Sequence, residues 1–248
     1  MPTVRASSRV GVSAVAEMAQ RCGMDRDFRP LPALALGAQE VTPLELAAAY
    51  ATVASGGRRA DPLIIHQVTD LAGVAVETRR TATRQVVSPQ AAYLLNDVLR
   101  GVMVDGTGAS AARLGFRGVA AGKTGTTDDT RDAWFVGYTP DLLALVWVGY
   151  DDNARTGLTG ASGALPIWVD FMKRAGAAEA RAPFPEPDGI VRAVIDPTTG
   201  GLAVGTCPTK AIELYSDGSE PTRDCELHRP GFWRRIRDKL RRKERPPV

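Results

Sequence analysis

Three strand-like runs in the middle of the chain constrain the fold more than any other feature. The runs are GVAAGKTGT (118–126), DAWFVGYT (132–139) and LLALVWVGY (142–150). They are rich in aromatic, β-branched and small residues, and only Pro140 and Asp141 separate the last two. A connection that short is typical of a hairpin between antiparallel strands. We therefore expect an antiparallel sheet at the centre of this chain.

Helices are expected on both sides of these runs, where apolar residues recur at helical spacing. Their ranges are 12–22, 43–55, 88–104 and 165–175. The clearest start is at Thr42, because Pro43 takes the first helical position and Glu45 stands three residues beyond Thr42, which is a capping-box pattern. Segments 63–69 and 74–78 indicate a short hairpin. Helices that flank a packed antiparallel sheet predict an α/β or α+β domain.

A Pro-rich linker, APFPEPDG at 182–189, divides the chain. The predicted organisation is a main domain over 1–181, this linker, a small β-rich appendage over 190–228 and a basic tail over 229–248. The total charge is +3, yet residues 226–248 alone hold nine Lys/Arg and three Asp/Glu. The body therefore has a slight acidic excess, and it gives no indication of a nucleic-acid partner.

The apolar pattern also bears on membranes. The longest apolar run, 142–148, is far shorter than the roughly 20 residues of a spanning helix. The first twenty residues lack the apolar core of a secretory signal, so we expect neither a signal peptide nor a transmembrane segment. In 231–243, four apolar side chains would share one face of a basic helix, which suits an anionic membrane surface. A solvated, disordered end is the alternative for that segment.

The Gly-Lys-Thr triplet at 122–124 has two competing interpretations. In a phosphate-binding loop, Gly-x4-Gly-Lys-[Ser/Thr], backbone N–H groups hold a phosphate. That pattern requires glycine at position 117, which is Arg117 in this chain. It also requires a helix after the Lys-Thr pair, whereas another glycine, turn residues and an aromatic strand follow here. The phosphate-loop interpretation is therefore disfavoured.

The second interpretation is the Lys-Thr-Gly motif of serine acyltransferases, here Lys123, Thr124 and Gly125. On an exposed strand the lysine supplies positive potential, and the small threonine and glycine let a substrate peptide pair with the strand edge. The hydroxyl of Thr126 would bind a substrate carboxylate. The predicted order of strand, turn and hairpin agrees with this interpretation.

Longer stretches around the motif carry a family resemblance. They are VTPLELAAAYATVASGG (41–57), DVLRGVMVDGTGASAA (97–112), KTGTTDDTRDAWFVGYTPDLLALVWVGYDD (123–152), GIVRAVIDPTTGGLAVGTCP (189–208) and CELH (225–228). Together they resemble the transpeptidase domain and the C-terminal extension of class A penicillin-binding proteins, the bifunctional peptidoglycan synthases. The resemblance covers nearly the whole chain.

This resemblance implies the penicillin-binding-protein/β-lactamase-like transpeptidase fold, an antiparallel sheet packed by helices. It implies acyl transfer that cross-links peptidoglycan stem peptides, β-lactams as ligands, no cofactor, and an extracytoplasmic location at the cell membrane for the parent protein. The loop Gly106-Thr107-Gly108 resembles the family's loop beside the active-site strand, with an ordinary helix-terminating loop as the alternative. The resemblance implies that Lys123 is a catalytic residue. It also implies that residues 123–126 and the loop 106–108 bind the substrate.

Two of the family's three catalytic motifs are absent from this sequence. The Ser-x-x-Lys motif supplies a serine nucleophile activated by a lysine one helical turn later. Three positions before the five lysines stand Ala120, Asp170, Cys207, Ile236 and Leu240. Ser-x-Asn is absent because Leu94 and Asp151 stand two positions before the two asparagines.

The opening residues 1–24 resemble the segment that directly follows Ser-x-Asn in the family. This resemblance implies an N-terminally truncated fragment that begins just after that motif, and we expect it to be inactive alone. A separate upstream fragment that complements it is a candidate partner. Without the helix that bears the nucleophile, strands 118–150 would expose apolar surface. The alternative function is a non-catalytic module that binds cell-wall peptides or a partner synthase.

Cys207 and Cys225 lie in the appendage with 17 residues between them. A disulfide is expected if the parent domain faces the outside of the cell. A metal site that includes His228 and a pair of free thiols are the alternatives, and the irregular spacing of three ligands does not favour a metal. Cys22 is expected to be a small buried apolar residue in its helix.

The aromatic residues of the strand runs are expected to be core rather than ligand platform. They are Trp134, Phe135, Tyr138 and Trp147. The pair Arg131-Asp132 is expected to order the turn that follows the Lys-Thr-Gly strand, a structural rather than a chemical role.

Overall fold

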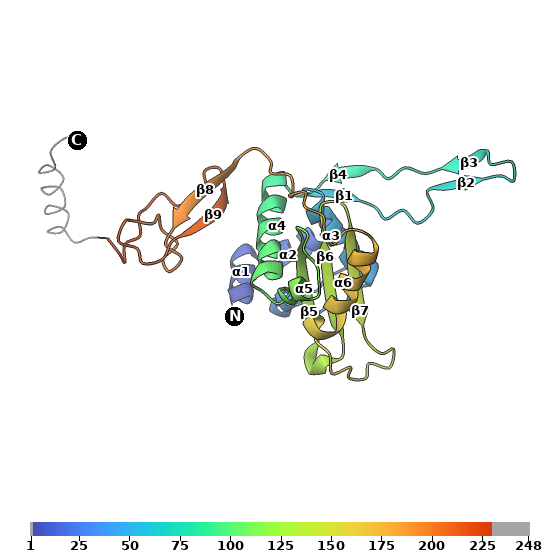
Figure 1. Cartoon of the computed structure of the whole chain (residues 1–248), viewed down its shortest axis with the longest axis horizontal. Helices are drawn as coiled ribbons and strands as arrows, with labels where there is room; N and C mark the ends of the chain where they lie inside the picture. Colours follow the sequence, from blue (N-terminus) through green and yellow to red (C-terminus); the bar gives the residue numbers. More distant parts are fainter. Residues whose placement is uncertain (1, 230–248) are drawn as a thin grey trace, which may run out of the picture. The chain divides into compact units, whose positions relative to one another are not determined.

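A three-stranded antiparallel sheet organises the first part of the chain in the computed structural model, which describes residues 2–229 (Figure 1). Its strands are β5 (Ala121–Thr126), β6 (Ala133–Tyr138) and β7 (Leu143–Val148), in the order β5-β6-β7. Lys123 is paired with Val136, and Val136 with Leu145. Each strand falls inside one of the three predicted runs, so the prediction of an antiparallel sheet is confirmed.

Six α-helices occur in the described residues. They are α1 (Pro2–Val10), α2 (Val12–Cys22), α3 (Pro43–Ala54), α4 (Pro89–Val104), α5 (Ser110–Arg113) and α6 (Leu165–Arg174). Short helical turns are η1 (Pro32–Leu36), η2 (Asp128–Thr130) and η3 (Gly160–Ala164). All four predicted helices are confirmed to within one residue at each end. The sequence pattern misses α1 because this helix buries only Ser7 and so has no apolar stripe.

One face of the sheet packs against α6 through a cluster of aromatic rings. The fully buried Trp168 has its ring 4.9 Å from that of Phe116 and 5.2 Å from that of Phe135, measured between centroids. Its indole N–H donates a 2.9 Å hydrogen bond to the carbonyl of Gly137. That bond satisfies the one polar group of the indole, so the side chain can be buried completely.

The opposite face of the sheet packs against α3 and α4 through a buried polar chain. The Tyr138 hydroxyl donates to Asn96 Oδ1 at 2.7 Å, and Asn96 Nδ2 donates to the carbonyl of Val53 at 3.2 Å. Burial, with a smaller effect from Tyr50, raises the pKa of Tyr138, while burial alone raises that of Tyr50 to about 12. The Tyr138 hydroxyl therefore remains a hydrogen-bond donor at all physiological pH values.

The prediction that four aromatic residues are core holds for only two of them. Phe135 and Tyr138 are fully buried, but Trp147 is 40% exposed and Trp134 is half-buried. Trp134 and Trp147 are cross-strand partners with ring centroids 6.0 Å apart. Trp147 lies on the edge strand β7 and Trp134 lies beside it on the central strand β6, and neither side chain is fully covered.

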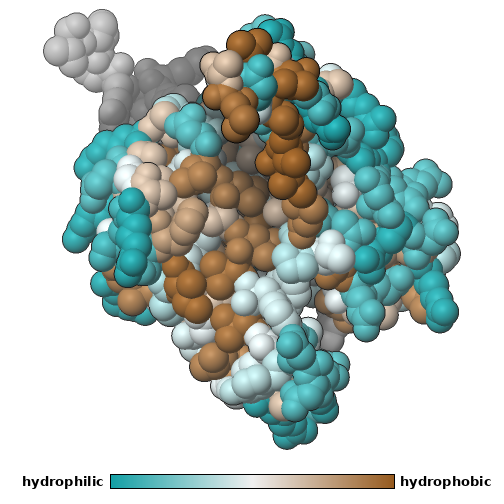
Figure 2. Space-filling model, turned by 90° about the vertical axis from the view of Figure 1, so that its right-hand side faces the viewer, coloured by the Kyte–Doolittle hydropathy of each residue, from teal (hydrophilic) through white to brown (hydrophobic). Residues whose placement is uncertain are grey.

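The side of the first unit that carries β7 has a broad hydrophobic surface (Figure 2). Five of the six residues of β7 are half-buried and the sixth, Trp147, is exposed. Within the described residues, β7 pairs with β6 alone, so the opposite edge of β7 offers unpaired backbone groups. The expected exposure of apolar surface at the strands is therefore present on this side.

Two small sheets complete the first unit. Strand β1 (Arg58–Ala60) pairs with β4 (Thr83–Gln85), and β2 (Gln67–Thr69) pairs with β3 (Ala75–Thr78). The β2-β3 hairpin confirms the predicted pair of short strands, although both are shorter than the predicted segments. Every residue of β2 and β3 is exposed. This hairpin therefore adds no core to the unit.

The chain divides into two compact units, residues 1–186 and 187–248, and the division lies inside the Pro-rich stretch. The described part of the second unit contains one hairpin, β8 (Ile190–Ile195) paired with β9 (Ala211–Ser216). The basic segment 231–243, expected to contact a membrane, lies outside the described residues. Among residues 2–229, no helix combines the length and apolar character required to cross a bilayer.

Candidate functional site

Strand β5 presents Lys123 to solvent at the edge of the sheet. The strand begins with two buried residues, Ala121 and Gly122, and continues with the exposed Lys123. Its partner within residues 2–229 is β6, so the other edge carries no further strand there. The Lys123 ammonium donates to the carbonyl of Thr124 at 2.7 Å, and its remaining N–H groups can bind an anion.

Glycine at position 122 allows β5 to pack tightly before it reaches Lys123. A Cβ on Gly122 would lie 2.9 Å from the ring of Phe135 and 3.1 Å from the sulfur of Met103 in α4. Contacts that short force neighbours to move. The Gly-Lys pair therefore places a residue packed closely against α4 directly before a residue whose side chain is exposed.

The loop after α4 is connected to the motif by two hydroxyl groups. Thr107 Oγ1 and Thr124 Oγ1 lie 2.7 Å apart, within hydrogen-bond distance. The loop curls back onto its helix, where the Gly108 N–H donates to the carbonyl of Val102 at 2.9 Å. A Cβ on Gly106 would lie 2.7 Å from Val102 Cα, so a larger residue would push this loop away. The structure thus brings residues 106–108 and 123–126 together.

Thr126 holds the far end of the strand against η3. Its hydroxyl oxygen accepts a 3.0 Å hydrogen bond from the Gly160 N–H, which leaves its own O–H available to donate. A Cβ on Gly160 would lie 2.3 Å from the carbonyl oxygen of Trp134, so only glycine fits there. Sequence reasoning missed Gly160, because nothing in its local pattern connects it with a strand 34 residues earlier.

The turn after β5 is ordered by Asp132. Its Oδ1 accepts from the Trp147 indole N–H at 2.9 Å, and its Oδ2 accepts from the Thr127 hydroxyl at 3.0 Å. Arg131 lies beside Asp129, with a shortest N–O distance of 3.7 Å. These contacts agree with the structural role expected of Arg131 and Asp132.

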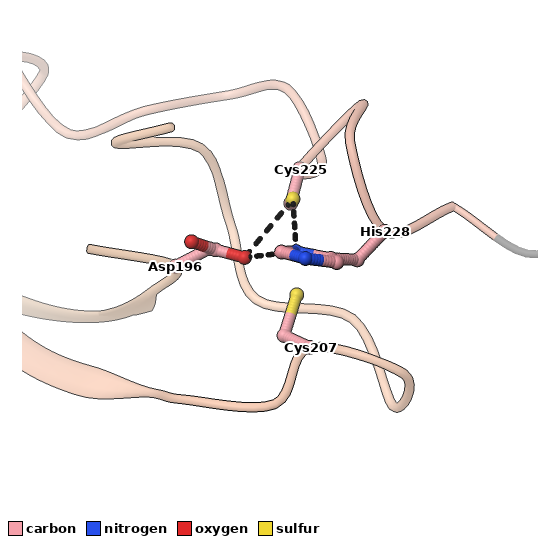
Figure 3. Close-up of side chains that lie close together, drawn as sticks. All are labelled: Asp196, Cys207, Cys225 and His228. Atoms are coloured by element: carbon pink, nitrogen blue, oxygen red, sulfur yellow. Dashed lines mark hydrogen bonds and ion pairs between the residues drawn. The ribbon is translucent and has the colours of Figure 1, made fainter. Parts of the chain in front are cut away.

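A second group of polar side chains lies in the second unit (Figure 3). It consists of Asp196, Cys207, Cys225 and His228, whose ligand-type atoms all lie within 4.8 Å of one another. The structure has Cys207 and Cys225 as free, buried thiols, and Cys22 likewise. Sequence reasoning connected both cysteines with His228 but missed Asp196, which stands 11 residues before Cys207.

Comparison with protein families agrees with the geometry of both units. Residues 14–167 match the penicillin binding protein transpeptidase domain, a match that includes β5, the 106–108 loop and most of the helices. The chain belongs to this family. Residues 186–230 match the C-terminal domain of penicillin-binding protein 1A. The expected transpeptidase fold and the class A resemblance are therefore both confirmed.

Individual relatives support the family assignment. The chain is 34% identical over 245 residues to penicillin-binding protein 2D of Bacillus subtilis, covering 96% of this chain and 35% of the relative. It is 36% identical over 219 residues to penicillin-binding protein 1A of Aquifex aeolicus, covering 88% of this chain and 30% of the relative. The chain thus spans about a third of the length of these curated relatives.

Solved structures show the same fold. The crystal structure of penicillin-binding protein 1A from Haemophilus influenzae matches with a TM-score of 0.81 and 30% identity, over 90% of this chain and 39% of that one. PonA1 from Mycobacterium tuberculosis in complex with penicillin V matches with a TM-score of 0.60 and 24% identity, over 70% and 52% of the two chains. The second match shows the fold alone.

Proposed function

We propose that residues 106–108 and 123–126, the β5 wall, form one side of an acyl-transfer cleft that binds β-lactams and peptidoglycan stem peptides. The observation that carries the proposal is the 2.7 Å contact between Thr107 and Thr124. This contact joins the loop after α4 to β5, the edge strand that carries the family's Lys-Thr-Gly motif. In the parent protein the cleft acts at the extracytoplasmic face of the membrane, where peptidoglycan is assembled.

Each group of the β5 wall has a chemical role in such a cleft. The exposed ammonium of Lys123 attracts the carboxylate that stem peptides and penicillins both carry. The open edge of β5 pairs with an extended peptide through backbone hydrogen bonds. The Thr126 hydroxyl, whose oxygen already accepts from Gly160, donates its hydrogen to a substrate oxygen. The β5 wall thus binds and orients the substrate.

The nucleophile of acyl transfer must come from elsewhere. No lysine of the 248-residue sequence is preceded by serine at the Ser-x-x-Lys spacing, so the β5 wall faces no activated serine of this sequence. We infer that these 248 residues bind β-lactams without forming a penicilloyl ester. A complementing segment that carries Ser-x-x-Lys and Ser-x-Asn would restore the ester.

The test has a covalent and a non-covalent arm. The chain is incubated with a fluorescent penicillin and separated by denaturing electrophoresis, with a class A transpeptidase domain that contains Ser-x-x-Lys as the positive control. We expect no labelled band from this chain, and a labelled band contradicts the inference of inactivity.

The non-covalent arm measures penicillin binding by calorimetry. Lys123→Gln should weaken binding several-fold because the carboxylate loses its cationic partner. The matched control is Lys173→Gln, which removes an exposed ammonium from α6 and should leave binding unchanged. Equal affinities for the wild type and the Lys123 variant would contradict the role proposed for the β5 wall.

A further inference from the structure

The second unit has very little apolar core for an ordered domain. In its described part, 187–229, the buried apolar side chains are Ala193, Ile195, Cys207 and Cys225. A two-stranded hairpin of this kind is marginal in water without further support. Domains near this size usually depend on a disulfide or a metal ion. Cys207 and Cys225 are free thiols in this structure, so a disulfide does not stabilise the second unit, and the polar groups around the two thiols become the candidates.

We propose that Asp196, Cys207, Cys225 and His228 bind a structural Zn²⁺ ion through one carboxylate oxygen, two thiolates and one imidazole nitrogen. This set is called the C-terminal cluster below. It supplies four donors of the N, S and O types that zinc prefers, which fills a tetrahedral shell and leaves no open position for catalysis. Binding displaces the protons of both thiols, because thiolates are the zinc ligands.

The three distances among the donor atoms of Asp196, Cys225 and His228 are close to those of a zinc site, and all four donors of the C-terminal cluster lie within 4.8 Å of one another. With zinc–sulfur bonds of about 2.3 Å and zinc–nitrogen or –oxygen bonds of about 2.0–2.2 Å, neighbouring donors of a tetrahedron lie about 3.3–3.8 Å apart. Cys225 Sγ lies 3.2 Å from Asp196 Oδ2 and 3.4 Å from His228 Nδ1. The Asp196–His228 pair, at 2.5 Å, would open by less than about 1 Å to admit the ion.

Three loop segments converge to form the C-terminal cluster. Asp196 follows the last residue of β8, Cys207 lies between β8 and β9, and Cys225 and His228 follow β9. Backbone hydrogen bonds hold these segments together, with the Cys225 N–H donating to the carbonyl of Leu202 at 2.7 Å. The connection between β8 and β9 and the segment after β9 are therefore already joined by backbone hydrogen bonds, and an ion would cross-link them through their side chains.

Neighbouring backbone groups orient the ligands. The Thr198 N–H donates to Asp196 Oδ1 at 2.8 Å, which leaves Oδ2 directed at the other three residues. The Val204 N–H donates to the sulfur of Cys207 at 3.3 Å. Outer contacts of this kind fix the orientation of metal ligands. Asp196 is fully buried and the His228 side chain is 24% exposed, so the imidazole lies on the solvent side of the site.

The direct test measures metal in the full chain, purified under reducing conditions without chelator. Elemental mass spectrometry should find one zinc per chain. Replacement by Co²⁺ should produce the visible bands of a tetrahedral site and a thiolate-to-cobalt charge-transfer band. Cys207→Ser and Cys225→Ser should each abolish both signals. The matched control is Cys22→Ser, which removes a buried thiol from α2 in the other unit and should keep full zinc content.

Two measurements keep the proposal falsifiable if a cysteine variant fails to fold. Competition with a chromogenic chelator measures the zinc affinity of the wild type alone. Asp196→Asn keeps both thiols and the side-chain volume, and it should weaken that affinity at least tenfold. A wild type that takes up no zinc, a cobalt complex without the charge-transfer band, or a Cys207–Cys225 disulfide in the peptide map of a second batch purified without reductant would each overturn the proposal.

Discussion

Two glycines with opposite surroundings show how single residues control this fold. A Cβ on Gly137 in β6 would lie 2.7 Å from both the Phe135 ring and the Trp168 indole, in the packed layer between the sheet and α6. A Cβ on Gly101, in the interior of α4, would contact nothing within 4 Å. Alanine should therefore be harmful at the first position, where it overpacks the core, and favourable at the second, where it restricts the unfolded chain.

At this scale we predict that Gly137→Ala lowers the free energy of unfolding by about 1–3 kcal/mol. Gly101→Ala should raise it by about 0.5–1 kcal/mol, the usual difference between glycine and alanine in a helix. Urea unfolding followed by circular dichroism measures both changes. A Gly137→Ala variant as stable as the wild type would mean that α6 packs more loosely on the sheet than these distances require.

At the scale of an element, the start of α3 is stabilised by a reciprocal cap and an ion pair. The Glu45 N–H donates to the Thr42 hydroxyl, and Glu45 Oε2 accepts from the Thr42 N–H at 2.8 Å. The same carboxylate binds Arg26 at 2.8 Å. The hydrogen bond from Arg26, followed by those from Thr42, lowers the pKa of Glu45 to about 2. The ionised form of Glu45 is therefore the one that stabilises the folded chain.

This lowered pKa sets the pH range in which the contribution of Glu45 to the free energy of unfolding is lost. Because the pKa is lowered on folding, the stabilisation is complete above about pH 4.5, the ordinary value, and is lost as pH falls toward 2. Glu45→Gln should therefore destabilise the chain at pH 7 and have a much smaller effect near pH 2.5. Denaturant titrations at both pH values measure this, with the exposed Glu17→Gln as control. An equal loss of unfolding free energy in Glu45→Gln at both pH values would contradict the proposed role of the ionised carboxylate.

At the scale of the whole molecule, the two units obtain stability in different ways. The first has a continuous apolar core that includes Phe135, Leu165 and Trp168. The second has the C-terminal cluster in place of a comparable core. If zinc occupies this cluster, a chelator removes the main stabilising element of one unit and leaves the other intact.

Hydrogen exchange read by mass spectrometry measures this difference within one sample. After chelator treatment, peptides from β8 and β9 should lose protection, while peptides from β5 to β7 should keep theirs. Added Zn²⁺ should restore the protection of β8 and β9. Protection of β8 and β9 that does not change with chelator would show that this hairpin is stable without metal.

Local patterns in the sequence predict the parts of the fold whose causes are local. The strands β5, β6 and β7 follow from runs of aromatic, β-branched and small residues with a short connection at Pro140-Asp141, and the start of α3 follows from Thr42, Pro43 and Glu45. The prediction that Lys123-Thr124-Gly125 lies on a strand has a similar local basis, because β5 pairs with β6, the next strand along the chain. Helix α1 was missed because it buries one serine and has no apolar stripe for a pattern to detect.

Contacts between distant segments depend on how the chain closes in space, and no local pattern encodes them. The pairing of Thr107 with Thr124, the fit of Gly160 against β6 and the arrival of Asp196 beside Cys225 each join segments 17 or more residues apart. The exposure of Trp147 is of the same kind, because an apolar side chain is covered only when another element reaches it. Residue type sets which groups can bind an acyl donor or a metal, and the folded chain sets which of them meet.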